Sequence, residues 1–106
     1  MNINFDTNQS TLKTDGREVV DQIVALLRGV PALNLSIEGH TDNTGSAERN
    51  KMLSAERSNA VTLALVNTGI GKDRLKAVGF GAEKPLVAND SEDNKAKNRR
   101  VELVKF

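Results

Sequence analysis

Three polar residues in a row, His40, Thr41 and Asp42, stand in the glycine-flanked stretch GHTDNTG at residues 39–45. Fifteen positions after the aspartate, Arg57 falls among apolar residues spaced three and four apart, which places it on the inward face of an expected helix. A guanidinium in that position loses hydration and needs an anionic partner. The Asp42 loop can supply this anion by folding back over the first turns of the helix. The sequence therefore predicts a buried pair of opposite charges.

Two interpretations of the Asp42–Arg57 pair are open. The pair can be an internal salt bridge that only fixes the loop. Alternatively, both charges can be left open as a preformed socket for a ligand of mixed sign, such as the zwitterionic end of an amino acid. Arg57 would then bind the carboxylate in a bidentate way, and Asp42 would bind the ammonium group.

Two asparagines are further candidates for this socket. Asn50 lies about two turns before Arg57 on the same helical face, near a helix start whose free N–H groups favour an anion. It is equally suited to be a helix cap. Asn8 follows the first expected strand, where it can also form no more than an Asx turn.

Catalytic and metal sites have weaker support. His40 is the single histidine, no serine stands in a G-x-S-x-G elbow, and only carboxylates are available to join the imidazole around a metal ion. We expect His40 to pack the loop and to hydrogen-bond locally. Glu38 and Asp42 could form a hydrolase pair, but Glu38 should point away from the strand face that bears Leu35 and Ile37. We expect no catalytic residue, no metal and no cofactor.

Composition limits the remaining classes of function. The 106 residues, 38% hydrophobic and 27% charged, indicate one globular domain over residues 1–106, with no segment able to cross a bilayer. Fifteen basic against fourteen acidic residues leave a charge of +1, which argues against a nucleic-acid partner. The basic cluster KAKNRR at residues 95–100 lacks interleaved aromatics, so we expect a solvated edge of the last strand. Arg99 would reach the same cleft if that strand lies beside the first or second strand.

Hydrophobic periodicity predicts the elements that position these residues. The stripe of the first helix contains Val19, Val20, Ile23, Leu26, Leu27 and Val30. The predicted segments are a strand at 3–5, a helix from 14 that stops at Gly29 and Pro31, a strand at 33–39, a helix at 47–68, a strand at 74–81, a surface loop at 83–98 and a strand at 99–106. Apolar residues on both faces of the last strand predict partial cover on both sides.

This order, β-α-β-α-β-β, predicts an α+β fold. Strands separated by helices need crossover connections, so part of the sheet is parallel. The expected architecture is a two-layer α/β sandwich with a mixed parallel and antiparallel sheet packed on two helices. The cleft at the end of the second strand, beside Asp42, is the natural ligand site of such a sheet.

Three stretches, IEGHTDNTGSAERNKMLSAERSNAV, LKAVGFGAEKP and NRRVEL, closely resemble the OmpA-like C-terminal domain, the peptidoglycan-binding module of Gram-negative envelope proteins. The resemblance runs from NINFDTNQSTL to the last strand and so covers essentially the whole chain. It implies a soluble periplasmic domain of a membrane-anchored parent. Such a domain binds the meso-diaminopimelate residue of the peptidoglycan stem peptide and cleaves nothing.

The same resemblance implies the roles of individual residues. The aspartate of HTD, here Asp42, and the arginine of LSAER, here Arg57, correspond to the binding residues of the family. Further ligand contacts are implied at Asn8, Thr44, Asn50 and Arg99. The alternative is a structural or protein-interaction module of the envelope, in which Asp42 and Arg57 form only an internal salt bridge.

Overall fold

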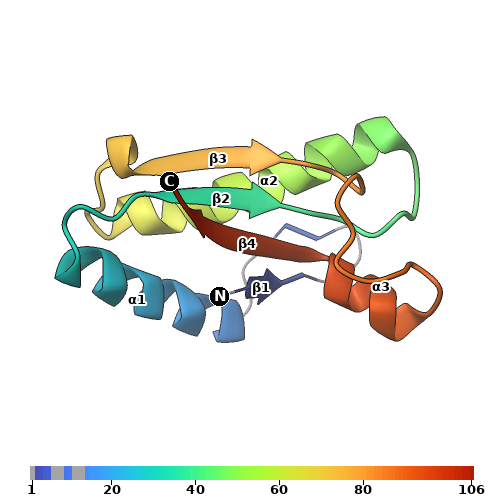
Figure 1. Cartoon of the computed structure of the whole chain (residues 1–106), viewed down its shortest axis with the longest axis horizontal. Helices are drawn as coiled ribbons and strands as arrows, with labels where there is room; N and C mark the ends of the chain where they lie inside the picture. Colours follow the sequence, from blue (N-terminus) through green and yellow to red (C-terminus); the bar gives the residue numbers. More distant parts are fainter. Residues whose placement is uncertain (1, 6–8, 11–13) are drawn as a thin grey trace.

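The computed structural model describes residues 2–5, 9–10 and 14–106, and these form a four-stranded sheet with helices (Figure 1). In chain order the elements are β1 (Asn2–Asn4), α1 (Thr14–Gly29), β2 (Leu35–Gly39), α2 (Ala47–Asn67), the short 3₁₀ helix η1 (Lys72–Arg74), β3 (Leu75–Gly79), α3 (Glu92–Asn98) and β4 (Arg100–Lys105). The predicted α+β class is confirmed, with α3 and η1 added to it.

The sheet has the strand order β1-β4-β2-β3. β2 and β3 run parallel, as the α2 crossover between them requires, while β4 is antiparallel to both β1 and β2. The mixed sheet is therefore confirmed. β4 lies inside the sheet, so the expectation that KAKNRR forms a solvated edge is wrong: Arg99 and Arg100 are buried. An internal strand must bury its flanking residues, whatever their charge.

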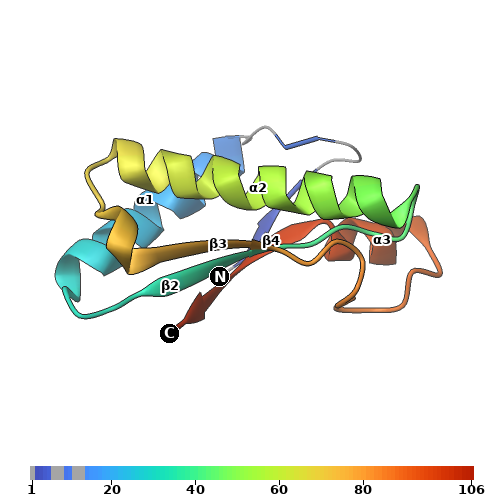
Figure 2. The same ribbon diagram turned by 90° about the horizontal axis from the view of Figure 1, so that it is seen from above.

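α1 and α2 lie on one face of the sheet, and Figure 2 shows the two helices above it with the other face free of helices. Leu35 and Ile37 of β2 point into the core between helices and sheet, and strand alternation places Glu38 on the opposite face, as predicted. Within the described ranges, no helix combines the length and apolar character needed to cross a membrane. The core consists of Ile3, Phe5, Val20, Ile23, Val24, Leu27, Leu35, Ile37, Val61, Leu65, Ile70 and Val101.

The buried stripe of α1 differs from the predicted one. Val20, Ile23, Val24 and Leu27 are buried, at spacings of three and four residues. Leu26 and Val30, expected in the stripe, are exposed. The apolar surface of α1 is wider than its contact with the sheet and α2, and only the packing decides which part is covered.

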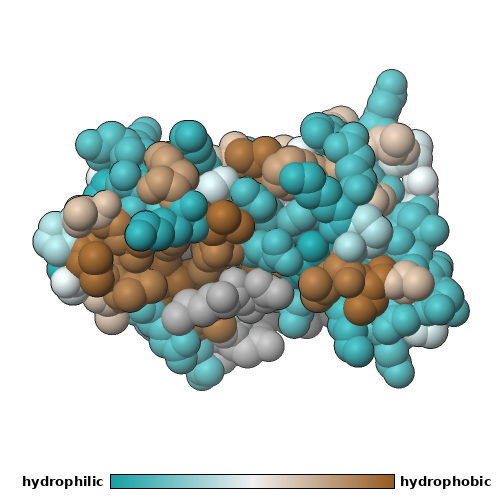
Figure 3. All heavy atoms as spheres, viewed as in Figure 1, coloured by the Kyte–Doolittle hydropathy of each residue, from teal (hydrophilic) through white to brown (hydrophobic). Residues whose placement is uncertain are grey.

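The predicted cover on both faces of the last strand is also wrong. Val101 is fully buried on the helix side, but Val104 and Phe106 are exposed, because both packed helices lie on the other face. Figure 3 shows apolar side chains gathered at the end of the molecule where the chain terminates. Lys76 covers part of this surface, with its Nζ 4.2 Å from the centroid of the Phe106 ring.

The segment at 83–98, predicted as a surface loop, contains α3. Ser91 caps this helix, and its Oγ accepts a hydrogen bond from the Asn94 amide. Acidic residues fill the first turn and lysines the last, which suits the helix dipole. Seven residues are too few for an apolar period to appear in the sequence, so only the cap signalled this helix.

Candidate functional site

A pair of glycines sets the position of the loop that carries Asp42. Gly39 ends β2 and Gly79 ends β3, and the two are partners in the parallel register. A Cβ at Gly39 would overlap the Ser54 carbonyl of α2, and one at Gly79 would lie 2.7 Å from the Ala55 amide nitrogen. The first half of α2 therefore rests directly on the ends of both strands, and the loop must turn tightly between them.

Backbone hydrogen bonds then hold the loop after β2. The His40 amide donates to the carbonyl of Arg100 at 2.8 Å, and the Thr41 amide donates to the carbonyl of Gly81 at 2.9 Å. The Gly81 amide in turn donates to Ser54 Oγ at 2.9 Å. These contacts connect the loop to β4, to the segment after β3 and to α2, so the side chain that follows is placed by three elements.

That side chain is Asp42, which is only 4% exposed. Its Oδ1 accepts a hydrogen bond from the Thr44 amide at 2.8 Å, and its Oδ2 accepts one from Nη1 of Arg99 at 2.9 Å. Burial by itself would raise the pKa of Asp42, but the hydrogen bonds from Thr44 and Arg99 outweigh it and hold this pKa below its usual value. Asp42 is therefore a carboxylate at neutral pH.

Arg99 comes from the residue just before β4. Because β4 lies between β1 and β2, the residue that precedes it reaches the Asp42 loop, as the sequence allowed. The Arg99 Nε donates to the carbonyl of Phe5 at 3.1 Å, and Nη1 also lies 3.3 Å from Oε1 of Glu92 on α3. Glu92 is an exposed carboxylate at the rim, which sequence reasoning missed because α3 was not predicted.

Arg57 lies on the inward face of α2, as predicted, and has no exposed surface. Its Nη1 donates to the His40 carbonyl at 3.0 Å and its Nε to the Gln9 carbonyl at 2.8 Å, and the guanidinium carbon lies 5.2 Å from the Phe5 ring centroid. Burial lowers the pKa of Arg57 to about 10, against the attraction of Asp42 and together with the repulsion of Arg99.

The two predicted charges are thus close, but their arrangement differs from the expected open socket. The ion pair at 2.9 Å joins Asp42 to Arg99, whereas the charge of Asp42 acts on Arg57 by raising the pKa of the guanidinium against the effect of burial. Both side chains are enclosed in this conformation. The reason is that the backbone carbonyls of Gln9 and His40, which the spacing did not predict as partners, bind Arg57, while the guanidinium of Arg99 binds Asp42.

The remaining predicted site residues differ in their burial and in their contacts. Asn50 is buried one turn inside α2, and Ser46 is the N-cap, so the capping role for Asn50 is wrong. Among the described residues, nothing hydrogen-bonds to the Asn50 side chain. Thr44 is exposed, and its amide holds Asp42. Asn8 lies outside the described residues.

His40 packs as expected but does not hydrogen-bond as expected. It is 1% exposed, and its ring stacks on Phe80 with centroids 5.4 Å apart. Neither ring nitrogen has a hydrogen-bond partner in the described structure. Burial lowers the pKa of His40 to about 4, with help from Arg100 and Lys84 and against Glu102. The imidazole is therefore neutral at physiological pH.

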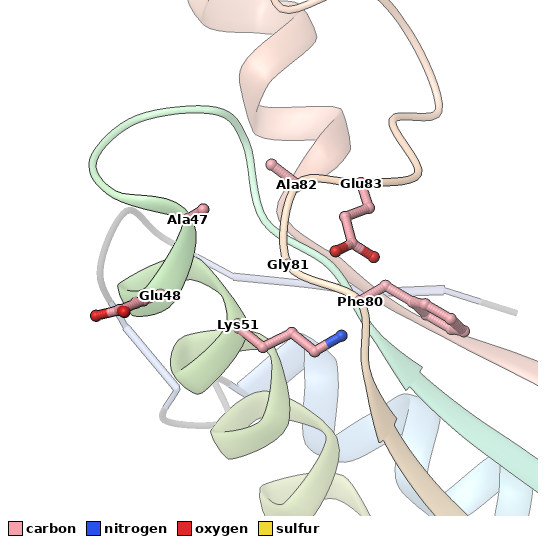
Figure 4. Close-up of a pocket in the computed structure, with 7 residues that line it drawn as sticks. All are labelled: Ala47, Glu48, Lys51, Phe80, Gly81, Ala82 and Glu83. Atoms are coloured by element: carbon pink, nitrogen blue, oxygen red, sulfur yellow. The ribbon is translucent and has the colours of Figure 1, made fainter.

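A cavity of about 560 Å³ lies beside the first turns of α2. In Figure 4, Lys51 and Glu83 extend toward the same space from α2 and from the segment after β3, while Glu48 points away. The cavity has room for a ligand group next to the loop of Asp42, and the sequence predicted no binding role for the residues that line it. Its lining consists of Ala47, Glu48, Lys51, Phe80, Gly81, Ala82 and Glu83.

The sequence profile of the OmpA family matches residues 4–99. The chain belongs to the OmpA family. Its fold agrees with this assignment, since a solved structure, the peptidoglycan-associated lipoprotein from Burkholderia pseudomallei, superimposes with a TM-score of 0.94 at 31% identity over 99% of this chain and 89% of that one. Family membership places the chain among non-catalytic domains.

Further OmpA-like relatives come from different kinds of protein. The cell wall anchor of the T6SS from Pseudomonas aeruginosa superimposes with a TM-score of 0.84 at 26% identity, over 99% of this chain and 78% of that chain. The peptidoglycan-binding protein ArfA of Mycobacterium tuberculosis is 36% identical over 102 residues, and the probable lipoprotein YiaD of Escherichia coli is 33% identical over 103 residues. These alignments cover 96% and 97% of this chain but 31% and 47% of those proteins, so the chain spans less than half of their length.

Proposed function

We propose that this OmpA-like domain binds peptidoglycan non-covalently, without cleaving it, through the diaminopimelate residue of the stem peptide. It would thereby attach an envelope protein to the cell wall from the periplasm. The names of several relatives support this proposal, because they describe peptidoglycan association, peptidoglycan binding or cell-wall anchoring.

The convergence of one carboxylate and two guanidinium groups beside the first half of α2 is the observation that carries the proposal. Asp42 comes from a loop, Arg57 from α2 and Arg99 from the residue between α3 and β4, and the buried amide of Asn50 lies on the same helix face as Arg57. The side-chain end of diaminopimelate has an ammonium group and a carboxylate on one carbon. Asp42 would bind the ammonium, and Arg57 would bind the carboxylate.

Binding requires an exchange of partners at both charges. At Arg57, the ligand carboxylate would replace the Gln9 carbonyl on Nε, and a charged acceptor makes the stronger hydrogen bond. At Asp42, the ligand ammonium would compete with Arg99, which has a second carboxylate within reach in Glu92. Arg99 can therefore keep an ion pair while Asp42 changes partner.

Thr44 and Asn8 complete the proposed set. The Thr44 amide fixes the Asp42 carboxylate, and its exposed side chain lies at the edge of the loop, where it can reach the ligand. Asn8 remains a proposed contact from the resemblance alone. A single site of this kind would bind weakly, but a polymer with many stem peptides raises the effective concentration of ligand for an anchored protein.

The first test removes the charge of Asp42 and keeps the shape of its side chain. Asp42→Asn should weaken binding to purified sacculi roughly ten- to hundredfold, because a charge-assisted hydrogen bond contributes about 1.5–3 kcal/mol. Co-sedimentation with sacculi measures this loss. The matched control is Asp73→Asn in η1, an exposed position at the other end of α2, which should bind like the wild type.

Thermal unfolding of both variants shows whether they keep the fold. A folded Asp42→Asn variant that binds as well as Asp73→Asn would remove Asp42 from the site.

The second test concerns the ligand and the alternative function. The internal pair of Asp42 with Arg99 is what favours a purely structural module. Calorimetry with a stem tripeptide that contains diaminopimelate should give heat, whereas its lysine counterpart, which lacks the second carboxylate, should bind much more weakly. Equal binding of both peptides would contradict diaminopimelate recognition. Absence of heat with either would favour the structural or protein-interaction module.

A further inference from the structure

A second cluster of ionisable groups lies on the face of the sheet that is free of helices (Figure 2). Glu38 of β2 and Glu102 of β4 are directly opposite one another in the antiparallel register, and His40 follows β2 on the same face. One ligand atom of each of these three side chains lies within 4.8 Å of the others. Like charges that face each other across two strands destabilise a sheet unless something lies between them.

His40 provides an independent observation. It is almost completely buried, and neither of its ring nitrogens has a hydrogen-bond partner in the part of the chain that the structure describes. Nε2 lies 3.8 Å from Oε2 of Glu102, which is too far for a hydrogen bond. Buried polar atoms without partners are rare in proteins, and an ion is one of the few explanations for them.

The surroundings hold all three side chains in place. Phe80 stacks on the imidazole. The Arg100 Nε donates to Oε1 of Glu102 at 2.9 Å, which leaves Oε2 turned toward His40, and Ser36 Oγ donates to Oε2 of Glu38 at 3.2 Å. Partners of this kind orient the ligands of known metal sites.

We propose that Glu38, His40 and Glu102 bind one divalent transition-metal ion of the Zn²⁺ type. One imidazole nitrogen with two carboxylate oxygens suits Zn²⁺, whereas Mg²⁺ and Ca²⁺ prefer oxygen ligands only. Glu38 and Glu102 are half-buried, so further coordination positions can be filled by solvent. Composition alone argued against a metal because only carboxylates could join His40, and it is the strand register that brings two of them to it.

Two positive charges oppose this ion and limit its affinity. Arg100 is paired with Glu102, and Lys84 has its Nζ 4.0 Å from the Phe80 ring centroid, near His40. We therefore expect the ion to bind more weakly than it would without these two neighbouring cations. The site does not depend on the proposed function, since its side chains lie on the opposite side of the loop backbone from Asp42 and Arg57.

The test uses the fact that His40 is the only histidine, so its ring resonances need no assignment in a chain without a histidine tag. Titration with Zn²⁺ at neutral pH should saturate at one ion per chain and shift these resonances, whereas Mg²⁺ should leave them in place. Glu38→Gln and Glu102→Gln should each weaken Zn²⁺ binding by at least about tenfold, the loss that even changes behind the ligands can cause. Glu18→Gln on α1 is the matched control and should bind like the wild type.

Ring resonances of His40 that do not move at millimolar Zn²⁺ would overturn the proposal. So would equal binding by the wild type and both cluster variants, which would indicate an adventitious ion only. The ring signals of the wild type decide the question even if a variant fails to fold.

Discussion

Two adjacent arginines, Arg99 and Arg100, have ion-pair partners in two different clusters. Arg99 pairs with Asp42 at 2.9 Å on one side of the chain, and Arg100 pairs with Glu102 at 2.9 Å on the other. Side chains of consecutive residues in extended backbone point to opposite faces, so the dipeptide serves two separate clusters. A one-residue shift of β4 would turn each of its side chains to the other face, so Arg99 would no longer point toward Asp42.

At the same scale, we predict that His40 titrates far below the ordinary pKa of histidine. Burial and the charge of Arg100 should keep its pKa near 4, because the protonated ring would lose hydration without gaining a hydrogen bond. Proton NMR of the single histidine, followed against pH in the presence of a chelator, measures this value directly. A titration midpoint at or above 6 would show that the ring is hydrated or paired in solution.

At the scale of elements, the close packing of α2 on the sheet positions the candidate site. The glycine pair at the ends of β2 and β3 allows Ser54 and Ala55 to contact the strand backbone. Ser58 adds a hydrogen bond of 2.6 Å from its Oγ to the Ile37 carbonyl. Small residues on the helix and glycines on the strands thus bring the first half of α2, with Asn50 and Arg57, next to the loop of Asp42.

We therefore predict that Gly39→Ala destabilises the domain strongly. The added methyl group would overlap the Ser54 carbonyl, and since backbone on both sides must shift, the loss should reach about 3 kcal/mol or more. Chemical denaturation measures it. Gly29→Ala at the end of α1 is the matched control: its Cβ would meet nothing within 4 Å, and the change should alter stability by no more than about 1 kcal/mol. Equal stability of the two variants would contradict the close packing.

At the scale of the whole molecule, the two faces of the sheet carry different groups of residues. The helix side contains the apolar core and, at its edge, the cluster of Asp42, Arg57 and Arg99. The helix-free side carries His40 with Glu38 and Glu102. Groups on both faces have lowered pKa values. The free energy of unfolding of the whole domain should therefore depend on pH.

We predict that stability falls steadily as the pH drops below about 6.5. Between this value and about 4, the unfolded chain binds a proton at histidine that folded His40 does not bind, so acid favours unfolding. A difference of this size corresponds to roughly 3 kcal/mol. Asp42 and Glu102, whose pKa values are also lowered, add a further loss below the ordinary range of carboxylates.

Denaturant unfolding at a series of pH values, with a chelator present, measures this curve. A stability that stays constant from pH 7 to 5 would contradict a buried neutral His40.

The sequence by itself determined the elements that have a clear period or a clear stop. α1 and α2 begin and end within one residue of prediction, because caps, glycines and apolar spacing are local properties of the chain. The inward position of Arg57 and the burial of His40 were predictable for the same reason. α3 was missed, since six polar residues and one alanine after a single cap have no hydrophobic period.

Only the tertiary structure decided the partners. The strand order places β4 between β1 and β2, and this alone gives Asp42 to Arg99 and sets Glu102 beside His40 and Glu38. Such contacts join residues up to 64 positions apart (102 minus 38), which no local pattern encodes. Charge and spacing select the residues that need a partner, but the register of the sheet selects which partner each one has.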